Sequence, residues 1–181
     1  FDNPLLQGDP TLVRNDEEIN FNWSTGAPSP QIPADNFTVR WTQTIAFSEG
    51  AYRFKARADD GVRVWVDDTQ IIDGVAKCGV TFVGHIWLPA GNHTVRIEYL
   101  ELGGNASVQV WREEITSFSA WRGEYFANPD LADAPLFVRD DPEISANWGD
   151  GSPGYGLPAD NFSIRWSRRL TLEAGRHNFW A

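Results

Sequence analysis

The sequence has one cysteine and no methionine among its 181 residues, and no apolar run is as long as a membrane span. One cysteine excludes an intrachain disulfide, so core burial or a bound metal must stabilise the chain. We expect Cys78 to be a small buried apolar residue rather than a nucleophile. The short apolar runs argue against membrane insertion of this segment. Because the chain starts at Phe1 without a methionine, we expect it to be a segment of a longer protein.

Basic residues are also scarce, since 15 lysines and arginines face 25 aspartates and glutamates, a formal net charge of -10. A nucleic-acid partner is excluded because it would require a basic patch to neutralise phosphates. Attraction to an anionic membrane surface is excluded for the same reason. The excess of carboxylates suits a protein displayed outside the cell and leaves side chains available for calcium.

Helical periodicity is weak throughout, whereas apolar and polar residues alternate in many short runs. The clearest run covers residues 37–47, where Val39, Trp41 and Ile45 face one side and Arg40 faces the other. Further strands are predicted over residues 51–58, 62–66, 80–88, 95–99 and 108–110, with turn residues between them. The pattern predicts an all-β antiparallel sandwich or barrel.

The chain repeats itself at an offset of 125 residues without a gap. The matched segments are 1–4 with 126–129, 12–16 with 137–141, 32–37 with 157–162, and 40–41 with 165–166. We therefore predict a module over residues 1–112 that lacks its first strand, a linker over 113–120, and the first half of a second module over 121–181. We expect this half module to be completed by further sequence or covered by a neighbouring chain, because its strand edges would otherwise be open.

Asp59, Asp60 and Gly61 stand where one predicted strand ends and the next begins. Adjacent carboxylates repel each other, and a hard cation such as Ca²⁺ would offset that repulsion. A polar hairpin turn explains the same residues, since Asp-Gly is a common turn sequence. Spacing alone leaves both interpretations open. A second acidic pair, Asp67 and Asp68, is interpreted as a hairpin turn.

Several runs, in order, resemble the PA14 domain family: residues 33–41, 52–67, 88–99, 108–111 and 121–126. The resemblance implies a jelly-roll-like β-sandwich that acts as a binding module. In adhesin members of that family an Asp-Asp pair carries a cis peptide and binds calcium, which holds the hydroxyl groups of a sugar. Asp59 and Asp60 match that pair, so the resemblance implies that both are metal and ligand-binding residues.

Two aspartates cannot supply the six to eight oxygens that calcium requires. We expect the loop over residues 101–107 to supply others, with the side-chain amide of Asn105 as a further metal and ligand-binding group. An ordinary Gly-Asn turn would equally explain Asn105. Residues 73–84 depart from the family pattern, and this loop is expected to shape a ligand pocket.

The residues favour a protein that is not an enzyme. Its three histidines, His85, His93 and His177, are scattered, and neither a nucleophile elbow nor a phosphate-binding loop occurs. We expect an extracellular or cell-surface adhesion module within a tandem array, with calcium as cofactor and a glycan as partner. The alternative is a structural repeat of a cell-surface protein or filament, assembled through neighbouring PA14 modules or copies of the same chain.

Overall fold

The computed structural model describes residues 1–75, 78–154 and 156–179. Within these ranges the regular elements are β-strands, and no helix is long and apolar enough to cross a bilayer. The strands are β1 (Ile19–Ser24), β2 (Phe37–Phe47), β3 (Gly50–Asp59), β4 (Gly61–Val66), β5 (Thr69–Gly74), β6 (Thr81–Leu88), β7 (Gly91–Glu101), β8 (Ala106–Glu114), β9 (Trp121–Phe126), β10 (Phe137–Asp141) and β11 (Ser163–Ser167).

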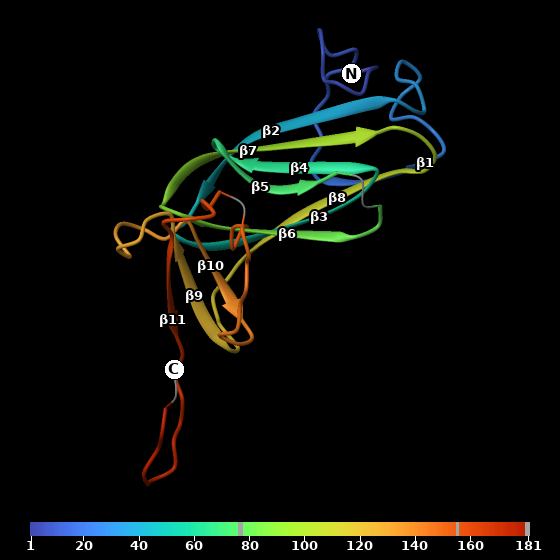
Figure 1. The fold of residues 1–181 in the computed structure, drawn as a ribbon. Coiled ribbons are helices and arrows are strands. Elements are labelled where there is room, and N and C mark those ends of the chain that lie inside the picture. The colour runs from blue at the N-terminus through green and yellow to red at the C-terminus, as the bar shows by residue number, and fades with distance from the viewer. Residues whose placement is uncertain (76–77, 155, 180–181) are drawn as a thin grey trace.

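Two four-stranded sheets face each other and form a sandwich (Figure 1). One has the strand order β1-β8-β3-β6 and the other β2-β7-β4-β5. Every pairing is antiparallel. The predicted all-β antiparallel sandwich is therefore confirmed.

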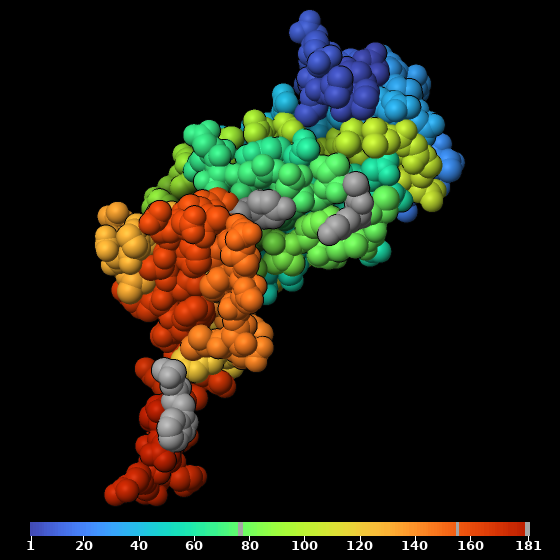
Figure 2. All heavy atoms as spheres, in the orientation of Figure 1, coloured from blue at the N-terminus to red at the C-terminus, as the bar shows by residue number. Residues whose placement is uncertain are grey.

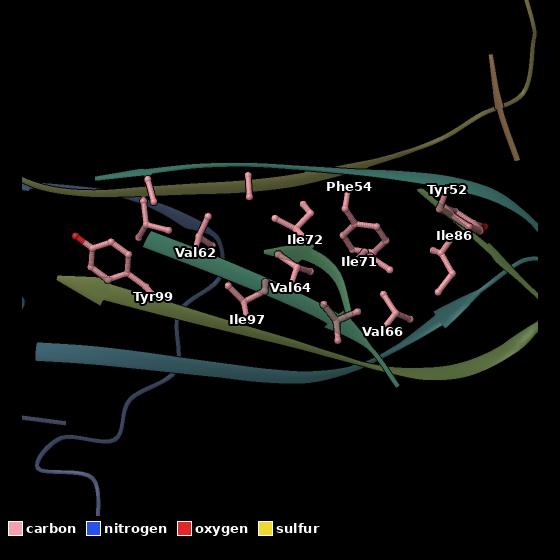
Figure 3. Close-up of a cluster of buried hydrophobic side chains, with 14 of the residues drawn as sticks. Tyr52, Phe54, Val62, Val64, Val66, Ile71, Ile72, Ile86, Ile97 and Tyr99 are labelled. Atoms are coloured by element: carbon pink, nitrogen blue, oxygen red, sulfur yellow. The ribbon is translucent and has the colours of Figure 1, made fainter. Parts of the chain in front are cut away.

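Alternating apolar side chains from both sheets fill the space between them (Figure 3). On β4, Val62, Val64 and Val66 are each at most 1% exposed, while Phe54 of β3 is 2% exposed. Each such side chain contributes about 1.5–3 kcal/mol on burial. The sandwich is held together by this contact between the inward faces.

The predicted strands match β2, β3, β4, β6, β7 and β8 closely, but β1 and β5 were not predicted. β5 lacks the alternating pattern that predicts a strand, because Ile71 and Ile72 are adjacent and both buried. A register shift in its pairing with β4 accommodates them. Asp67 and Asp68 form the turn between β4 and β5, as predicted.

The last third of the chain forms a separate three-stranded sheet with the order β10-β9-β11 (Figure 1). It packs against the β6 end of the sandwich, where the Trp87 amide donates to the Leu136 carbonyl at 2.9 Å. In Figure 2 this part lies directly against the sandwich, and the chain then extends away from it. Residues 168–179 are exposed and form no strand. At the repeat offset of 125 residues they match residues 43–54, of which 43–47 lie in β2 and 50–54 in β3. Completion of this part by other sequence stays a prediction.

Candidate cation site

Asp59 and Asp60 occupy the point where the chain crosses from one sheet to the other. Asp59 ends β3, and Gly61 begins β4. β3 pairs with β6 and β8, whereas β4 pairs with β5 and β7. The hairpin interpretation of this pair is therefore wrong, because the flanking strands belong to different sheets. The Asp59–Asp60 peptide bond is cis, as the family resemblance implies, and both side chains are partly buried.

The loop that follows β7 lies directly against this crossing. Oδ2 of Asp60 accepts hydrogen bonds from the amides of Leu102 at 2.7 Å and Gly103 at 3.3 Å. The next amide, that of Gly104, donates to Oδ1 of Asp35 at 3.1 Å. The structure thus brings the predicted loop to the aspartates, although the loop contacts them through backbone amides. Asn105 is exposed, and within the described residues no hydrogen bond joins it to either aspartate, so its role stays a prediction.

Tyr99 and Glu101, which the sequence reasoning did not select, lie beneath the two aspartates. The Tyr99 hydroxyl oxygen is 2.5 Å from the Asp59 carbonyl oxygen and 2.7 Å from Glu101 Oε2. Glu101 is fully buried, and its Oε1 has no hydrogen-bond partner within the described part of the chain. The sequence did contain a signal that Glu101 is buried. Glu101 continues the alternating series Val95, Ile97 and Tyr99, whose side chains face the core from β7.

The electrostatics of this cluster disfavour a further negative charge. Burial raises the pKa of Glu101, and the charges of Asp60 and Asp59 raise it further, against the lowering effects of the Tyr99 hydroxyl and the Gly103 backbone amide. Burial and the hydrogen bond to Glu101 also raise the pKa of Tyr99. No salt bridge from a described lysine or arginine reaches Asp59, Asp60 or Glu101. A buried, partly orphaned carboxylate beside two more is an arrangement that a hard cation stabilises.

Cys78 joins the cluster, and the expectation that it is buried is wrong. It is exposed, and its Sγ lies 3.6 Å from Asp60 Oδ1. Ligand atoms of Asp59, Asp60 and Cys78 lie within 4.8 Å of one another. Hydrogen bonding to Asp59, followed by desolvation, raises the pKa of Cys78 to about 11, so the thiol stays protonated at neutral pH. Since the thiolate is the nucleophile and the metal ligand, Cys78 acts here as a weak hydrogen-bond donor. The predicted departure from the family pattern includes residues 76 and 77, which lie outside the described residues.

The structure is thus an antiparallel β-sandwich with an acidic pair, Asp59 and Asp60, where the chain crosses between its two sheets. A family model described as PA14 domain matches residues 1–119. The chain belongs to the PA14 domain family.

Three proteins similar to this chain over most of its length are named as anti-sigma factors or anti-sigma factor domain-containing proteins. The anti-sigma-I factor RsgI3 of Acetivibrio thermocellus is 31% identical over 187 residues, which covers 88% of this chain and 28% of the relative. A solved anti-sigma factor domain-containing protein from Clostridium clariflavum has a TM-score of 0.57 and 29% identity, covering 92% of this chain and 66% of its own. Another solved anti-sigma factor domain-containing protein has a TM-score of 0.55 and 27% identity, covering 86% of this chain and 61% of its own. The chain therefore spans little more than a quarter of its curated relative.

These relatives correct the predicted function and partners. An adhesion module that recognises carbohydrate, with a glycan as partner, is wrong, because proteins similar over most of the chain are named as anti-sigma factors. The surface-protein and filament assignments conflict with the same finding, and the structural-repeat alternative gains no support. The error arose because the sugar was taken from the family resemblance, whereas the Asp-Asp-Gly residues themselves select no sugar.

Proposed function

We propose that this PA14 domain is the sensing part of an anti-sigma-type regulatory protein, and that a divalent cation at Asp59 and Asp60 controls its state. The chain itself carries out no catalysis in this proposal. Similarity to anti-sigma factor proteins over 88% of the chain supports the regulatory role. A chain that spans 28% of that relative leaves room for the sigma factor to be held elsewhere in the whole protein.

The unpartnered Oε1 of buried Glu101 is the observation that carries the cation part of the proposal. A carboxylate oxygen without a partner costs free energy in a buried position unless a cation or a proton reaches it. Asp59 and Asp60 would supply the outer ligands. Calcium would supply a charge of +2 that offsets the repulsion among these three carboxylates.

The hydrogen bonds of Asp60 provide a route from the cation to the surface. Oδ2 of Asp60 holds the amides of Leu102 and Gly103, both in an exposed loop. A cation that draws this carboxylate toward itself would weaken those bonds and release the loop. Binding of a cation would thus change the conformation of an exposed loop that other parts of the whole protein can contact. We retain the predicted extracellular location in this proposal, because weak calcium sites suit the calcium concentration outside cells.

A transcription reporter in cells tests the proposed function. The full-length protein would be produced with its sigma factor, and output from a sigma-dependent promoter would be measured with and without added calcium. We expect calcium to change the output several-fold for the wild type, and to have no effect on an Asp59→Asn, Asp60→Asn variant. Asp68→Asn removes an exposed carboxylate from the neighbouring turn and serves as the charge control, which should respond like the wild type. An equal response of the double variant would refute the proposal.

A further inference from the structure

His93 lies at the end of the sandwich opposite to Asp59 and Asp60. β4 runs from the crossing at these aspartates to the turn that begins with Asp67. His93 stands near the start of β7 and pairs with Ile45, close to the end of β2. Only 9% of the histidine is exposed. Its ring is thus enclosed by the connections at this end of the sandwich.

Three connections between strands contact this ring. Nδ1 of His93 lies 2.7 Å from Oδ2 of Asp67 in the β4–β5 turn, and Nε2 lies 3.0 Å from the carbonyl oxygen of Pro89. Pro89 stands between β6 and β7, where the chain crosses from one sheet to the other. The ring of Phe47, the last residue of β2, packs edge to face against the imidazole with 5.8 Å between ring centroids. One side chain therefore joins all three connections.

Both hydrogen-bond partners of the ring are acceptors. A carbonyl oxygen can only accept, and so can an ionised carboxylate. Neutral imidazole has a single N–H, so one of its two nitrogens would present a lone pair to a lone pair of Asp67 or Pro89. The imidazolium ring has an N–H at both nitrogens and satisfies both partners. The geometry therefore favours the charged ring.

The contacts of Asp67 favour its ionised form. Its Oδ1 accepts from the Thr94 amide at 2.8 Å, and its own amide donates to the Thr94 carbonyl at 2.7 Å. Although desolvation raises the pKa of Asp67, the hydrogen bonds from His93 and Thr94 lower it below its usual value. No described lysine or arginine forms an ion pair with this aspartate, so His93 is its cationic partner there.

Asp67 supplies the charge that faces His93, whereas Phe47 and the Pro89 carbonyl are uncharged. Arg112 of β8 lies against the Phe47 ring, with its guanidinium carbon 5.2 Å from the ring centroid. The hydrogen bond to Asp67 raises the pKa of His93 against the effect of desolvation, and the Pro89 carbonyl raises it further. The stability linked to this ring is therefore complete below pH 6.5 and falls as the pH rises through the pKa of the folded state.

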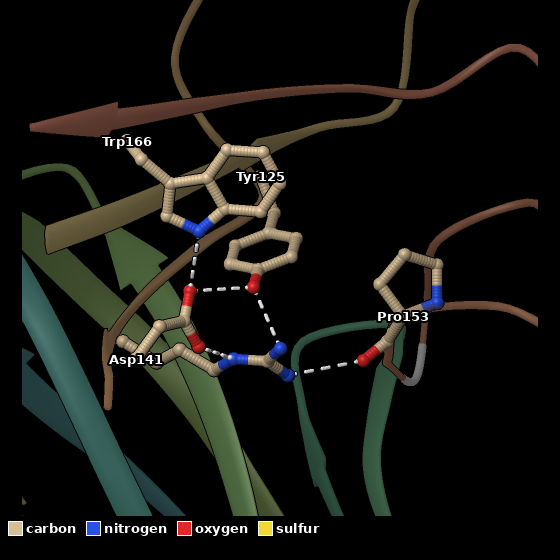
Figure 4. A network of polar contacts seen from close by, with 5 residues as sticks. Tyr125, Asp141, Pro153 and Trp166 are labelled. Atoms are coloured by element: carbon tan, nitrogen blue, oxygen red, sulfur yellow. Dashed lines mark hydrogen bonds and ion pairs between the residues drawn. The ribbon is translucent and has the colours of Figure 1, made fainter. Parts of the chain in front are cut away.

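The last three strands hold a carboxylate with a cation that does not titrate. Nε of Arg139 donates to Oδ1 of Asp141, and its Nη2 donates to the Tyr125 hydroxyl at 2.6 Å (Figure 4). The Trp166 indole donates to Oδ2 of the same aspartate at 2.8 Å. Because arginine stays protonated in proteins, this network persists at a pH where an imidazolium loses its proton.

We propose that His93 is a pH-sensitive clamp, which joins the β4–β5 turn to the crossing between β6 and β7 while it is charged and releases that crossing when it is neutral. Loss of the Nε2 proton leaves the Pro89 carbonyl without its donor, while Nδ1–H still donates to Asp67. Pro89 and Ala90 are both exposed, so the released segment lies at the surface. The clamp acts at the opposite end of the sandwich from the proposed cation site and does not depend on it.

Nitrogen-15 NMR of the histidine rings between pH 6 and pH 9 tests this clamp in the whole chain. We expect both ring nitrogens of His93 to carry a proton at pH 6.5, and the titration midpoint to lie above that value. The amide resonance of Ala90, which follows the released carbonyl, should move with the same midpoint. The indole resonance of Trp166 should stay unchanged and is the internal control.

Two variants each remove one carboxylate from the β4–β5 turn. Asp67→Asn should lower the midpoint of His93 by about one pH unit or more, because the ring loses an opposite charge in direct contact. Asp68→Asn removes the same charge from an exposed neighbour and should shift the midpoint much less. A wild-type midpoint at or below pH 6.5, an Ala90 resonance that does not follow the ring, or equal shifts in the two variants would overturn the proposal.

Discussion

The hydroxyl group of Tyr99 lies 2.5 Å from the carbonyl oxygen of Asp59 and 2.7 Å from Oε2 of Glu101. A hydroxyl has one hydrogen, so it can donate to only one of these two oxygens at a time. Burial raises the pKa of the Glu101 carboxyl, and the charges of Asp60 and Asp59 raise it further. Tyr99 therefore links the chain crossing at Asp59 to the buried carboxylate beneath it.

Removal of this hydroxyl should weaken both stability and calcium binding. We predict that Tyr99→Phe lowers the free energy of unfolding by about 1–2 kcal/mol, because either the buried Glu101 carboxylate or the Asp59 carbonyl loses its donor. Urea unfolding with and without calcium measures both effects. Tyr52→Phe is the matched control, since Tyr52 also donates to a backbone carbonyl, that of Ser48 at 3.0 Å, at the opposite end of β3 from Asp59. The prediction fails if both variants lose the same stabilisation by calcium.

Neutralisation of Glu101 should have opposite effects on the free and the calcium-loaded protein. Glu101→Gln removes a buried charge that burial and neighbouring aspartates disfavour. We predict that the calcium-free variant is more stable than the wild type by about 1 kcal/mol. Stabilisation by 10 mM calcium, about 1.4–2.7 kcal/mol for a dissociation constant of roughly 0.1–1 mM, should largely disappear. If Glu101→Gln keeps the full stabilisation by calcium, Glu101 takes no part in calcium binding.

Acid should weaken the contact between the sandwich and the last three strands through His85. Its ring lies 6.4 Å from the ring of Phe137, and burial followed by the charges of Arg139 and Arg53 lowers its pKa from 6.5 to about 4. The unfolded chain takes up this proton near pH 6.5, whereas the folded chain does so near pH 4. The stability linked to His85 is therefore complete above pH 6.5 and falls as the pH drops toward 4.

Thermal unfolding between pH 7 and pH 4 measures this effect. We predict that His85→Gln flattens the decline in melting temperature over that range. The exposed residue His177 offers a control, and His177→Gln should follow the wild-type curve. A decline as steep in His85→Gln as in the wild type would contradict this assignment.

Gly123 should be irreplaceable in the three-stranded sheet. An added Cβ would collide with the Asp141 carboxylate and lie 3.2 Å from the Trp166 indole nitrogen. We predict that Gly123→Ala destabilises this sheet by about 1–3 kcal/mol. The indole resonance of Trp166 in NMR spectra reports the change. Gly103→Ala is the control, because an added Cβ there would lie 3.9 Å from Asp35 Oδ1, an ordinary van der Waals distance.

The fold was predictable from the sequence because alternation of apolar residues is a local signal. Val62, Val64 and Val66 identify β4 without any knowledge of its neighbours. The Asp59 and Asp60 pair was also identifiable, but its environment was not. Whether it formed a hairpin or a crossing depended on which sheet each flanking strand joined, and that is a long-range property.

Other features of the site could not be predicted from the sequence, because they depend on contacts between residues far apart in the chain. Cys78 was expected to be buried by its residue type, yet its loop lies at the surface. Glu101 follows an inward-facing pattern, but its unpartnered oxygen appears only when Tyr99 and Asp59 are placed around it. The biological role was least accessible, because an acidic pair between two strands does not specify which larger protein carries the domain.

Calorimetric titration of the chain with calcium tests the central claim most directly. We predict saturable heat with about one ion per chain and a dissociation constant on the order of 0.1–1 mM. The Asp59→Asn, Asp60→Asn variant should lose this heat, and Asp68→Asn should retain it. Absence of binding heat in the wild type, or equal heat in the double variant, would contradict the assignment of this sheet crossing as a cation site.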